Sequence, residues 1–203
     1  MGNRRTSRKK DDTKKEIVEA FYLSKTKKIN GTRSMVRGKV LEVLFAYEIS
    51  GEPLDNLFEH IFFREFKFDP EEPETKRLLT KEEILELEAD VPIQWEEDDI
   101  RFAKELIEKT QQTRPFAIEE IKKSIANWEF ERLTVVDRLI LEIAIAELLH
   151  FANIDPEVTI NEAIEVAKQY STEKSGIFVN GVLDSLYKKF SEQGLIHKIK
   201  EKQ

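Results

Sequence analysis

The chain has 203 residues, with 33 Lys and Arg against 40 Asp and Glu, a formal net charge of −7, and no cysteine. A chain without cysteine forms no disulfide framework and no thiolate metal site, which fits a reducing compartment. Neither a secretory signal nor an apolar run of membrane-spanning length is present, so we expect a cytoplasmic protein with no membrane association.

The amino-terminal part of the chain is strongly basic. Residues 1–39 hold 13 Lys and Arg against 4 Asp and Glu, a local charge of +9 that leaves −16 for the remainder. Phosphate binding depends on local charge, because electrostatic attraction is screened within about 8–10 Å at ordinary salt. We interpret residues 1–32 as a basic extension that either contacts nucleic acid or is a solvated terminus.

Two helices are predicted after this extension. The first begins near Arg33 and ends near Ser50-Gly51, with an apolar face at helical spacing. That face comprises Val40, Leu41, Val43, Leu44 and Tyr47. The second runs from Leu54 to about Phe66, and its His60 is interpreted as a surface or boundary side chain.

An acidic segment, predicted as an insertion over about residues 69–99, comes next. It contains 13 acidic and 3 basic residues together with three prolines. Thr80 and Glu83 are a possible capping box for one short helix within it. The pairs Glu96-Glu97 and Asp98-Asp99 are interpreted as solvated charge rather than metal ligands, because adjacent residues do not share a helix face. One hypothesis is that the segment competes with RNA for the basic end.

Three further helices are predicted in the middle of the chain. A third core helix is predicted from Ile100, and Arg114-Pro115 is predicted to end it. A fourth helix is predicted from Phe116 to about Trp128. The Trp128 side chain is interpreted as a packing residue. The next helix begins after Thr134, which forms a capping pair with Asp137. It has few polar residues up to Leu149, as is typical of a helix buried on most sides.

Two amphipathic helices are predicted at the carboxyl end. A capping box of Thr159 and Glu162 indicates that one helix begins there. Residues 171–176 break the pattern, and the second helix runs from Phe178 to about Phe190, before Gly194. Residues 191–203 are interpreted as a tail.

Catalytic signatures are absent from the sequence. It contains no phosphate-binding loop, dinucleotide-binding motif or nucleophile elbow, and its three histidines have no metal-ligand spacing. We therefore expect neither an enzyme nor a bound cofactor or metal. The short helical pattern and the scarcity of alternating β-branched runs favour an all-α fold.

Three blocks, in a fixed order, carry a resemblance to a known family. They are RSMVRGKVLEVLFAYEISG from Arg33, VVDRLILEIAIAEL from Val135, and TINEAIEVAKQYSTEKSGIFVNGVLD from Thr159. This chain resembles the NusB family of bacterial transcription antitermination factors. The resemblance implies a seven-helix bundle in two helical halves over residues 33–190. It also implies binding of boxA-type RNA together with the ribosomal protein NusE, in a complex with RNA polymerase, and no small-molecule substrate.

The resemblance also implies which residues bind RNA. Arg37 matches the family's most characteristic arginine and Arg33 matches one before it, so both are expected to hold phosphates or bases. Ser34 and Met35 replace arginines that are common in relatives, and Gly38 stands where Glu is common. The arginine cluster is therefore thinned, and Lys39 with the basic extension is predicted to restore the charge.

Two more RNA-binding candidates lie in the last block. Phe178 is placed where the family has its RNA edge, and its ring either stacks on a base or packs in the core. Lys174 is predicted to lie beside it, in the turn over residues 171–176. Asn180 and Gly181 are interpreted as structural residues, the glycine permitting close approach of helices. Asn161, Glu162, Asp137 and Arg138 are interpreted as caps and a buried polar network.

An alternative function follows from the thinned arginine cluster. The chain is then a helical protein-interaction module that binds NusE or the polymerase through its acidic body, without sequence-specific recognition of RNA. The two hypotheses differ in whether the protein prefers boxA-type RNA to a scrambled sequence.

Overall fold

The computed structural model describes residues 29–63, 93–125 and 130–196. The chain divides into two compact units, one comprising Met1–Gly31 and Phe62–Gln94, the other Thr32–Ile61 and Trp95–Gln203. Most of the basic extension, most of the acidic insertion, Trp128 and the end of the predicted tail lie outside the described residues.

In the first unit the described residues form a small parallel strand pair. Strand β1 (Ile29–Asn30) lies beside β2 (Ile93–Gln94), with Ile29 opposite Ile93 and Asn30 opposite Gln94. The backbone N–H of Gly31 extends the pairing by donating to the carbonyl of Gln94 at 2.8 Å. Two residues per strand are too few for a sheet with its own core, so the predicted all-α class holds.

Helices α2 (Arg33–Ser50) and α3 (Leu54–Phe62) follow as the sequence predicts. The Thr32 hydroxyl accepts from the Met35 backbone N–H at the start of α2, and Gly51, at φ 68°, ends the helix. That left-handed conformation suits glycine, which has no Cβ to clash with the neighbouring carbonyl. Helix α3 ends at Phe62, because Phe63 is already a bend, so the helix is shorter than the predicted span to about Phe66.

The predicted break at Arg114-Pro115 is wrong, because helix α5 runs without interruption from Glu97 to Ser124 and contains Pro115. An internal proline removes one helical hydrogen bond and costs about 3 kcal/mol. Packing outweighs this cost, since α5 buries Ile107 before the proline and Ala117 and Ile121 after it.

The acidic run that precedes α5 has a local structural role. Glu97, Asp98 and Asp99 occupy the first turn of the helix, where negative charge is stabilised by the exposed backbone N–H groups and the helix dipole. These three residues, assigned from the sequence to the acidic insertion, therefore belong to a helix. Asp98 also accepts from Arg101 at 2.6 Å.

Helix α6 (Val135–His150) is the buried central helix that the sequence predicts, preceded by a short 3-10 turn, η1 (Phe130–Arg132). The Thr134 hydroxyl accepts from the backbone N–H of Asp137 at 3.0 Å, which confirms the predicted cap. Ten consecutive residues, Leu139–Leu148, are buried, including Glu142 and Glu147.

The capping box predicted at Thr159 is wrong. Helix α7 begins at Pro156 and runs to Tyr170, and its N-cap is Asp155, whose carboxylate accepts from the Glu157 backbone N–H at 2.9 Å. Proline is favoured at the first helical position because its missing N–H would have no helical partner there. Thr159 therefore lies inside α7, where it is buried.

The predicted break at residues 171–176 is shorter than expected. Helix α8 (Glu173–Glu192) starts directly after Thr172, whose hydroxyl accepts from the Ser175 backbone N–H at 3.0 Å. Only Ser171 and Thr172 separate α7 from α8, and these two helices pack on each other along the unit. The predicted end of this helix before Gly194 is confirmed.

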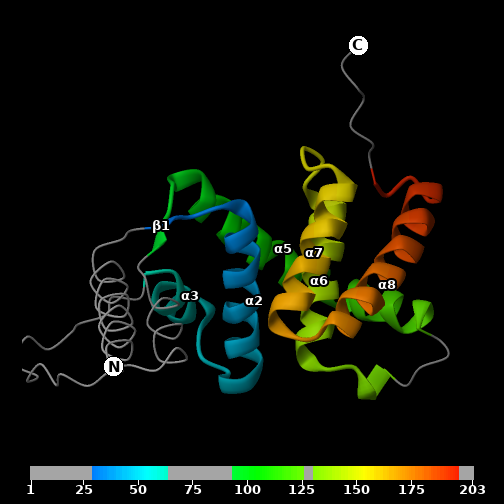
Figure 1. Ribbon diagram of the computed structural model, residues 1–203, viewed down its shortest axis with the longest axis horizontal. Coiled ribbons are helices and arrows are strands. Elements are labelled where there is room, and N and C mark those ends of the chain that lie inside the picture. Colours follow the sequence, from blue (N-terminus) through cyan, green and yellow to red (C-terminus); the bar gives the residue numbers. More distant parts are fainter. Residues whose placement is uncertain (1–28, 64–92, 126–129, 197–203) are drawn as a thin grey trace, which may run out of the picture. The chain divides into compact units, whose positions relative to one another are not determined.

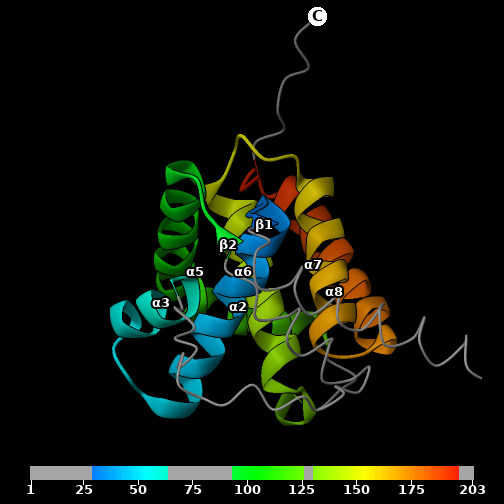
Figure 2. The ribbon, with the colours of Figure 1, turned by 60° about the vertical axis from the view of Figure 1, so that its left-hand side comes forward.

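Helix α6 lies at the centre of the second unit. It packs against α2, α5, α7 and α8, and the start of α2, the start of α5 and the end of α6 lie at one end of the unit (Figures 1 and 2). Six α-helices lie within the described residues, one fewer than predicted, because the predicted third and fourth helices form the single helix α5. None of the helices in the described ranges combines the length and the apolar character needed to cross a bilayer.

Candidate nucleic-acid interface

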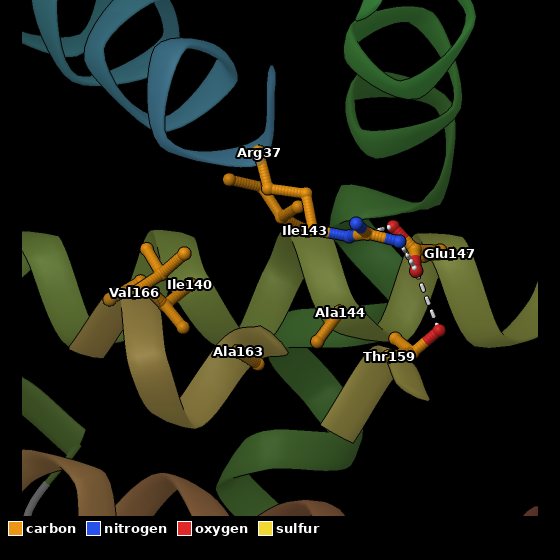
Figure 3. Close-up of a pocket in the computed structure, with 8 residues that line it drawn as sticks. All are labelled: Arg37, Ile140, Ile143, Ala144, Glu147, Thr159, Ala163 and Val166. Carbon is orange, nitrogen blue, oxygen red and sulfur yellow. Dashed lines mark hydrogen bonds and ion pairs between the residues drawn. The ribbon is translucent and has the colours of Figure 1, made fainter. Parts of the chain in front are cut away.

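A buried ion pair joins the start of α2 to the end of α6 and the start of α7. The guanidinium of Arg37 donates from Nε and Nη2 to the two carboxylate oxygens of Glu147, at 2.9 and 2.8 Å. The Thr159 hydroxyl donates to the same carboxylate at 2.6 Å (Figure 3). The side chains of Arg37 and Glu147 are only 7% and 1% exposed, so this cluster fixes three helices relative to one another.

The cavity beside this ion pair is too small to be a ligand site. Its volume is about 20 Å³, and apolar side chains of α6 and α7 line it together with Arg37, Glu147 and Thr159 (Figure 3). That space holds no more than a water-sized molecule. The ion pair is therefore a structural element of the second unit rather than a binding pocket.

Arg33 is the accessible arginine of the predicted pair. Its side chain is 45% exposed, and its Nε lies 3.1 Å from the Asp99 carboxylate. The buried ring of Phe102 lies beneath the guanidinium groups of both Arg33 and Arg37, whose central carbons are 4.4 and 5.3 Å from the ring centroid. Arg37 also donates from Nη1 to the Arg33 carbonyl at 3.2 Å. The buried arginine thus helps to position the exposed one.

Lys39 lies two residues after Arg37 on α2, in a second cluster. Its Nζ pairs with Glu42 at 2.7 Å, and the Tyr170 hydroxyl donates to the same carboxylate at 2.8 Å. Burial, followed by the negative charge and hydrogen bond of Glu42, raises the pKa of Tyr170 above its usual range. Lys39 is 26% exposed at its side chain, and its predicted charge contribution is shared with Glu42.

Gly38 leaves the space that Tyr170 occupies in this cluster. A Cβ built on Gly38 would lie 2.8 Å from the Tyr170 hydroxyl oxygen, closer than two such atoms approach in proteins. The glycine at a position where Glu is expected from the resemblance therefore has a physical reason in this chain. It permits Tyr170 of α7 to lie directly on α2.

Lys174 and Phe178 lie in the first two turns of helix α8, so the prediction that Lys174 lies in an interhelical turn is wrong. Lys174 is exposed, and the described part of the chain offers it no ion pair, while Phe178 is half-buried. The neighbouring Ser175 donates to the buried carboxylate of Asp137 at 3.3 Å, which ties this end of α8 to the start of α6.

Two structural interpretations made for α8 are wrong. Gly181 is exposed and a Cβ there would meet nothing within 4 Å, so it does not permit helix approach. The glycine with a close neighbour is Gly176, where a Cβ would lie 3.0 Å from the Lys168 side chain of α7. Asn180 is exposed within the helix rather than in a turn. Asn161 is likewise exposed.

The predicted site residues form two groups. Arg37 is hydrogen-bonded to Glu147, whereas Ser175, which lies between Lys174 and Phe178 on α8, is hydrogen-bonded to Asp137, and these two acidic residues belong to opposite ends of α6. They are ten positions apart in the sequence, which corresponds to about 15 Å along the helix. An RNA that contacts both groups must therefore follow the length of α6.

A second network of charges joins the end of α2 to α5 and α6. Glu48 accepts from Arg114 at 2.5 Å and from Arg138 at 2.7 Å, and both arginines also approach the buried Glu142. Burial alone would raise the pKa of Glu48, but the hydrogen bonds and charges of the two arginines outweigh it and lower that pKa. Burial raises the pKa of Glu142 despite the same arginines. The interpretation of Arg138 as part of a polar network is confirmed.

Sequence reasoning did not find Phe102, Glu147 or Tyr170 as residues that position the site. Each has the pattern of an ordinary helical residue, and their partners lie far away along the chain; Arg37 and Glu147 are 110 residues apart. Glu147 alone carried a signal, because a carboxylate among consecutive apolar residues in a buried helix needs a partner.

The second unit is an all-helical bundle with a buried central helix and an arginine-bearing first helix. The family model for the NusB family matches residues 34–188. The chain belongs to the NusB family.

Individual relatives agree with this assignment. The chain is 31% identical over 167 residues to the transcription antitermination protein NusB of Chloroherpeton thalassium, covering 82% of this chain and 66% of that protein. It is 40% identical over 117 residues to the NusB protein of Salinibacter ruber, covering 58% of this chain and 73% of the relative. The chain thus spans just under two thirds of the length of the first of these relatives.

Solved structures show the same fold. T. maritima NusB superposes with a TM-score of 0.60 at 29% identity, covering 82% of this chain and 98% of that one. A crystal structure of the antitermination factors NusB and NusE in complex with dsRNA superposes with a TM-score of 0.57 at 24% identity, covering 77% of this chain and 96% of that one. The second likeness concerns the fold alone.

Proposed function

We propose that this protein is a transcription antitermination factor that binds boxA-type RNA together with NusE and joins RNA polymerase to suppress termination, chiefly of ribosomal RNA transcription. It acts by binding, without a catalytic step, in the cytoplasm where transcription takes place. The observation that carries the proposal is membership of the NusB family, whose model matches residues 34–188. This range includes α2 from its second residue onward and the whole of α7.

The geometry supports a division of labour between the two arginines. Arg33 is exposed and uses Nε on Asp99, so its terminal N–H groups remain available for phosphate oxygens. Arg37 is buried and its guanidinium is already hydrogen-bonded to Glu147 and the Arg33 carbonyl. We assign direct contact to Arg33 and a positioning role to Arg37.

Lys174 and Phe178 are proposed as the second contact region. Lys174 adds a positive charge at the start of α8, and the half-buried ring of Phe178 has an edge that a base could meet. A base stacked on an aromatic side chain contributes about 1–3 kcal/mol. Lys39, with its charge shared with Glu42, is proposed to act mainly through the local potential.

The experiment is binding of a fluorescent boxA-type RNA and a scrambled RNA, at several salt concentrations, with and without NusE. We expect preference for the boxA-type RNA, strengthened by NusE. Arg33→Ala should reduce the slope of log affinity against log salt by about one, as for the loss of one phosphate contact. Equal, weak binding of both RNAs in the presence of NusE would refute the proposal.

Matched variants separate contact from scaffold. Lys174→Ala should weaken binding, whereas Lys188→Ala, an exposed lysine on the same helix, should not. Phe178→Leu keeps an apolar side chain but removes the stacking ring, so it tests stacking without emptying the core. Arg37→Lys, measured where it remains folded, should leave the salt slope unchanged if Arg37 only positions Arg33.

The alternative function is a helical interaction module that binds NusE or the polymerase without sequence-specific RNA recognition. One observation favours it: the burial of Arg37 leaves Arg33 as the exposed arginine of the first two turns of α2. This alternative predicts a stable complex with NusE that has the same affinity for boxA-type and scrambled RNA. The binding experiment above distinguishes the two functions.

A further inference from the structure

A polar pocket lies beside Arg33, where the start of α5 meets the end of α6. Its volume is about 160 Å³, large enough for one flat ring system. Besides Arg33, the residues that line it are Asp98, Arg101, Phe102, Glu105, His150, Phe151 and Asn153. Neither the buried ion pair nor the contacts assigned to Lys174 and Phe178 use this pocket.

The charges in the pocket do not favour a phosphate. Arg33 is paired with Asp99, and Arg101 with Asp98. Glu105 is exposed and has no ion pair within the described ranges, so it leaves a negative charge in the pocket. Burial, followed by the charge of Lys109, lowers the pKa of His150, which is therefore neutral at neutral pH. A phosphate group would meet an unpaired carboxylate there.

The shape of the arginine stack favours a planar ligand. The central carbon of the Arg33 guanidinium lies 4.4 Å from the centroid of the buried Phe102 ring. The Arg33 side chain is 45% exposed, so part of it remains accessible to a ligand. Guanidinium planes stack on unpaired RNA bases, so a base that stacks on the exposed part of Arg33 would extend the contact that begins with Phe102.

The pocket also offers hydrogen-bond acceptors and donors side by side. Glu105 contributes two carboxylate oxygens, and Asn153 contributes one acceptor and two donors. Arg101 uses Nη2 on Asp98, which leaves its other N–H groups for a ligand. Guanine matches this set, because its N1–H and N2–H₂ groups suit a carboxylate and its O6 and N7 atoms accept from an arginine.

We propose that this pocket binds a single unpaired base of an RNA strand, with guanine preferred, stacked on Arg33 and held by Glu105, Arg101 and Asn153. The proposal rests on the proposed RNA-binding function and adds a position of base recognition to it. Phosphate contacts position an RNA, whereas contacts with base edges read its sequence. The pocket therefore supplies sequence preference where the arginine cluster of α2 is thin.

The test uses four single-stranded RNA pentamers that differ only in the central base, UUGUU, UUAUU, UUCUU and UUUUU. Length and charge are constant, so electrostatic attraction cancels in the comparison. We expect the guanine pentamer to bind about tenfold more tightly than the uridine pentamer. Glu105→Gln should abolish this difference, because one carboxylate oxygen that accepts from guanine becomes a donor. Asn153→Ala should reduce it.

The control variant is Glu119→Gln, which removes the same charge from an exposed side chain near the other end of α5. It should keep the guanine preference. Equal affinity for all four pentamers would overturn the proposal, and this is the result expected if the pocket binds a basic peptide side chain instead of a base. The same guanine preference in Glu105→Gln and Glu119→Gln would overturn it as well. Loss of the boxA preference with guanine preference intact would refute only the proposed function, and the reverse result would refute only the pocket.

Discussion

Replacing Arg37 by methionine should destabilise the protein strongly, because the carboxylate of Glu147 would remain buried without its partner. Glu147 is 1% exposed and accepts two hydrogen bonds from Arg37, so little solvent is available to replace them. Removing one member of a buried ion pair typically costs about 3–5 kcal/mol. The Thr159 hydroxyl would still donate to the carboxylate, which places the expected loss near the lower end of that range.

The double variant Arg37→Met/Glu147→Met provides the decisive comparison. Replacing a buried ion pair by apolar side chains of similar size is often close to neutral. The double variant should therefore be more stable than Arg37→Met alone, with strong coupling between the two positions. The free energies of unfolding would be measured by urea denaturation followed by circular dichroism, on the two single variants and the double variant.

Lys39→Met is the matched control on the same helix. Its ion pair with Glu42 is 26% and 31% exposed, and such pairs contribute about 0–1 kcal/mol. The structural role of Arg37 would be refuted if Arg37→Met cost no more than Lys39→Met. The role would also be refuted if the effects of Arg37→Met and Glu147→Met on the free energy of unfolding were additive in the double variant.

Three further predictions concern other parts of the second unit. Gly38→Ala should destabilise the protein despite the better helix propensity of alanine, and Tyr170→Phe should relieve part of this cost by removing the clashing oxygen, as a double-mutant cycle of urea midpoints would show. Asp155→Ala should cost about 1 kcal/mol as the loss of an N-cap, and unchanged stability in the same assay would contradict the observed start of α7. Burial raises the pKa of Glu142 in the folded protein. The contribution of this group to the free energy of unfolding is therefore fully present below its unfolded-state pKa and is lost as pH rises through its folded-state pKa. Glu142→Gln does not titrate, so it should gain stability relative to the parent as pH increases. Parallel urea titrations at acidic and neutral pH would check this, and a difference that does not change with pH would exclude it.

Local sequence rules predicted the elements whose ends are fixed by neighbouring residues. Thr134 caps α6 by accepting from the backbone N–H of Asp137, three residues later, and Gly51 ends α2 by adopting a left-handed backbone conformation. Both signals lie within four residues, which is the range over which helix propensity and capping act. The central burial of α6 was also predictable, because its apolar residues surround the helix.

The same rules failed where tertiary packing decided the outcome. Pro115 is a strong local break signal, yet α5 continues because both of its halves pack in the same core. Thr159 has the spacing of a capping residue, but Asp155 with Pro156 starts the helix earlier and leaves the threonine hydroxyl for Glu147. At Pro115, packing outweighs a local cost of about 3 kcal/mol. At Thr159, a second local signal, the Asp155 cap with Pro156 at the first helical position, decides where the helix begins.

The candidate site was predicted only in part, because some of its contacts join residues that are far apart in the sequence. Arg33 and Arg37 were found as a pair, and their spacing of four places them on one helix face. What separates an exposed arginine from a buried one is a carboxylate 110 residues further along the chain. No pattern within α2 carries that information.

The long separation between Arg37 and Glu147 has a consequence for biosynthesis. A nascent chain that has emerged only through α5 contains Arg33 and Phe102, but not the carboxylate and hydroxyl that hold Arg37 in place. Those groups are translated with α6 and α7, so Arg33 and Arg37 reach their final arrangement only after the carboxyl-terminal half has been synthesised. An incomplete translation product therefore carries the arginines without the scaffold that orients them, and acquires the shaped surface only when nearly the whole chain is available.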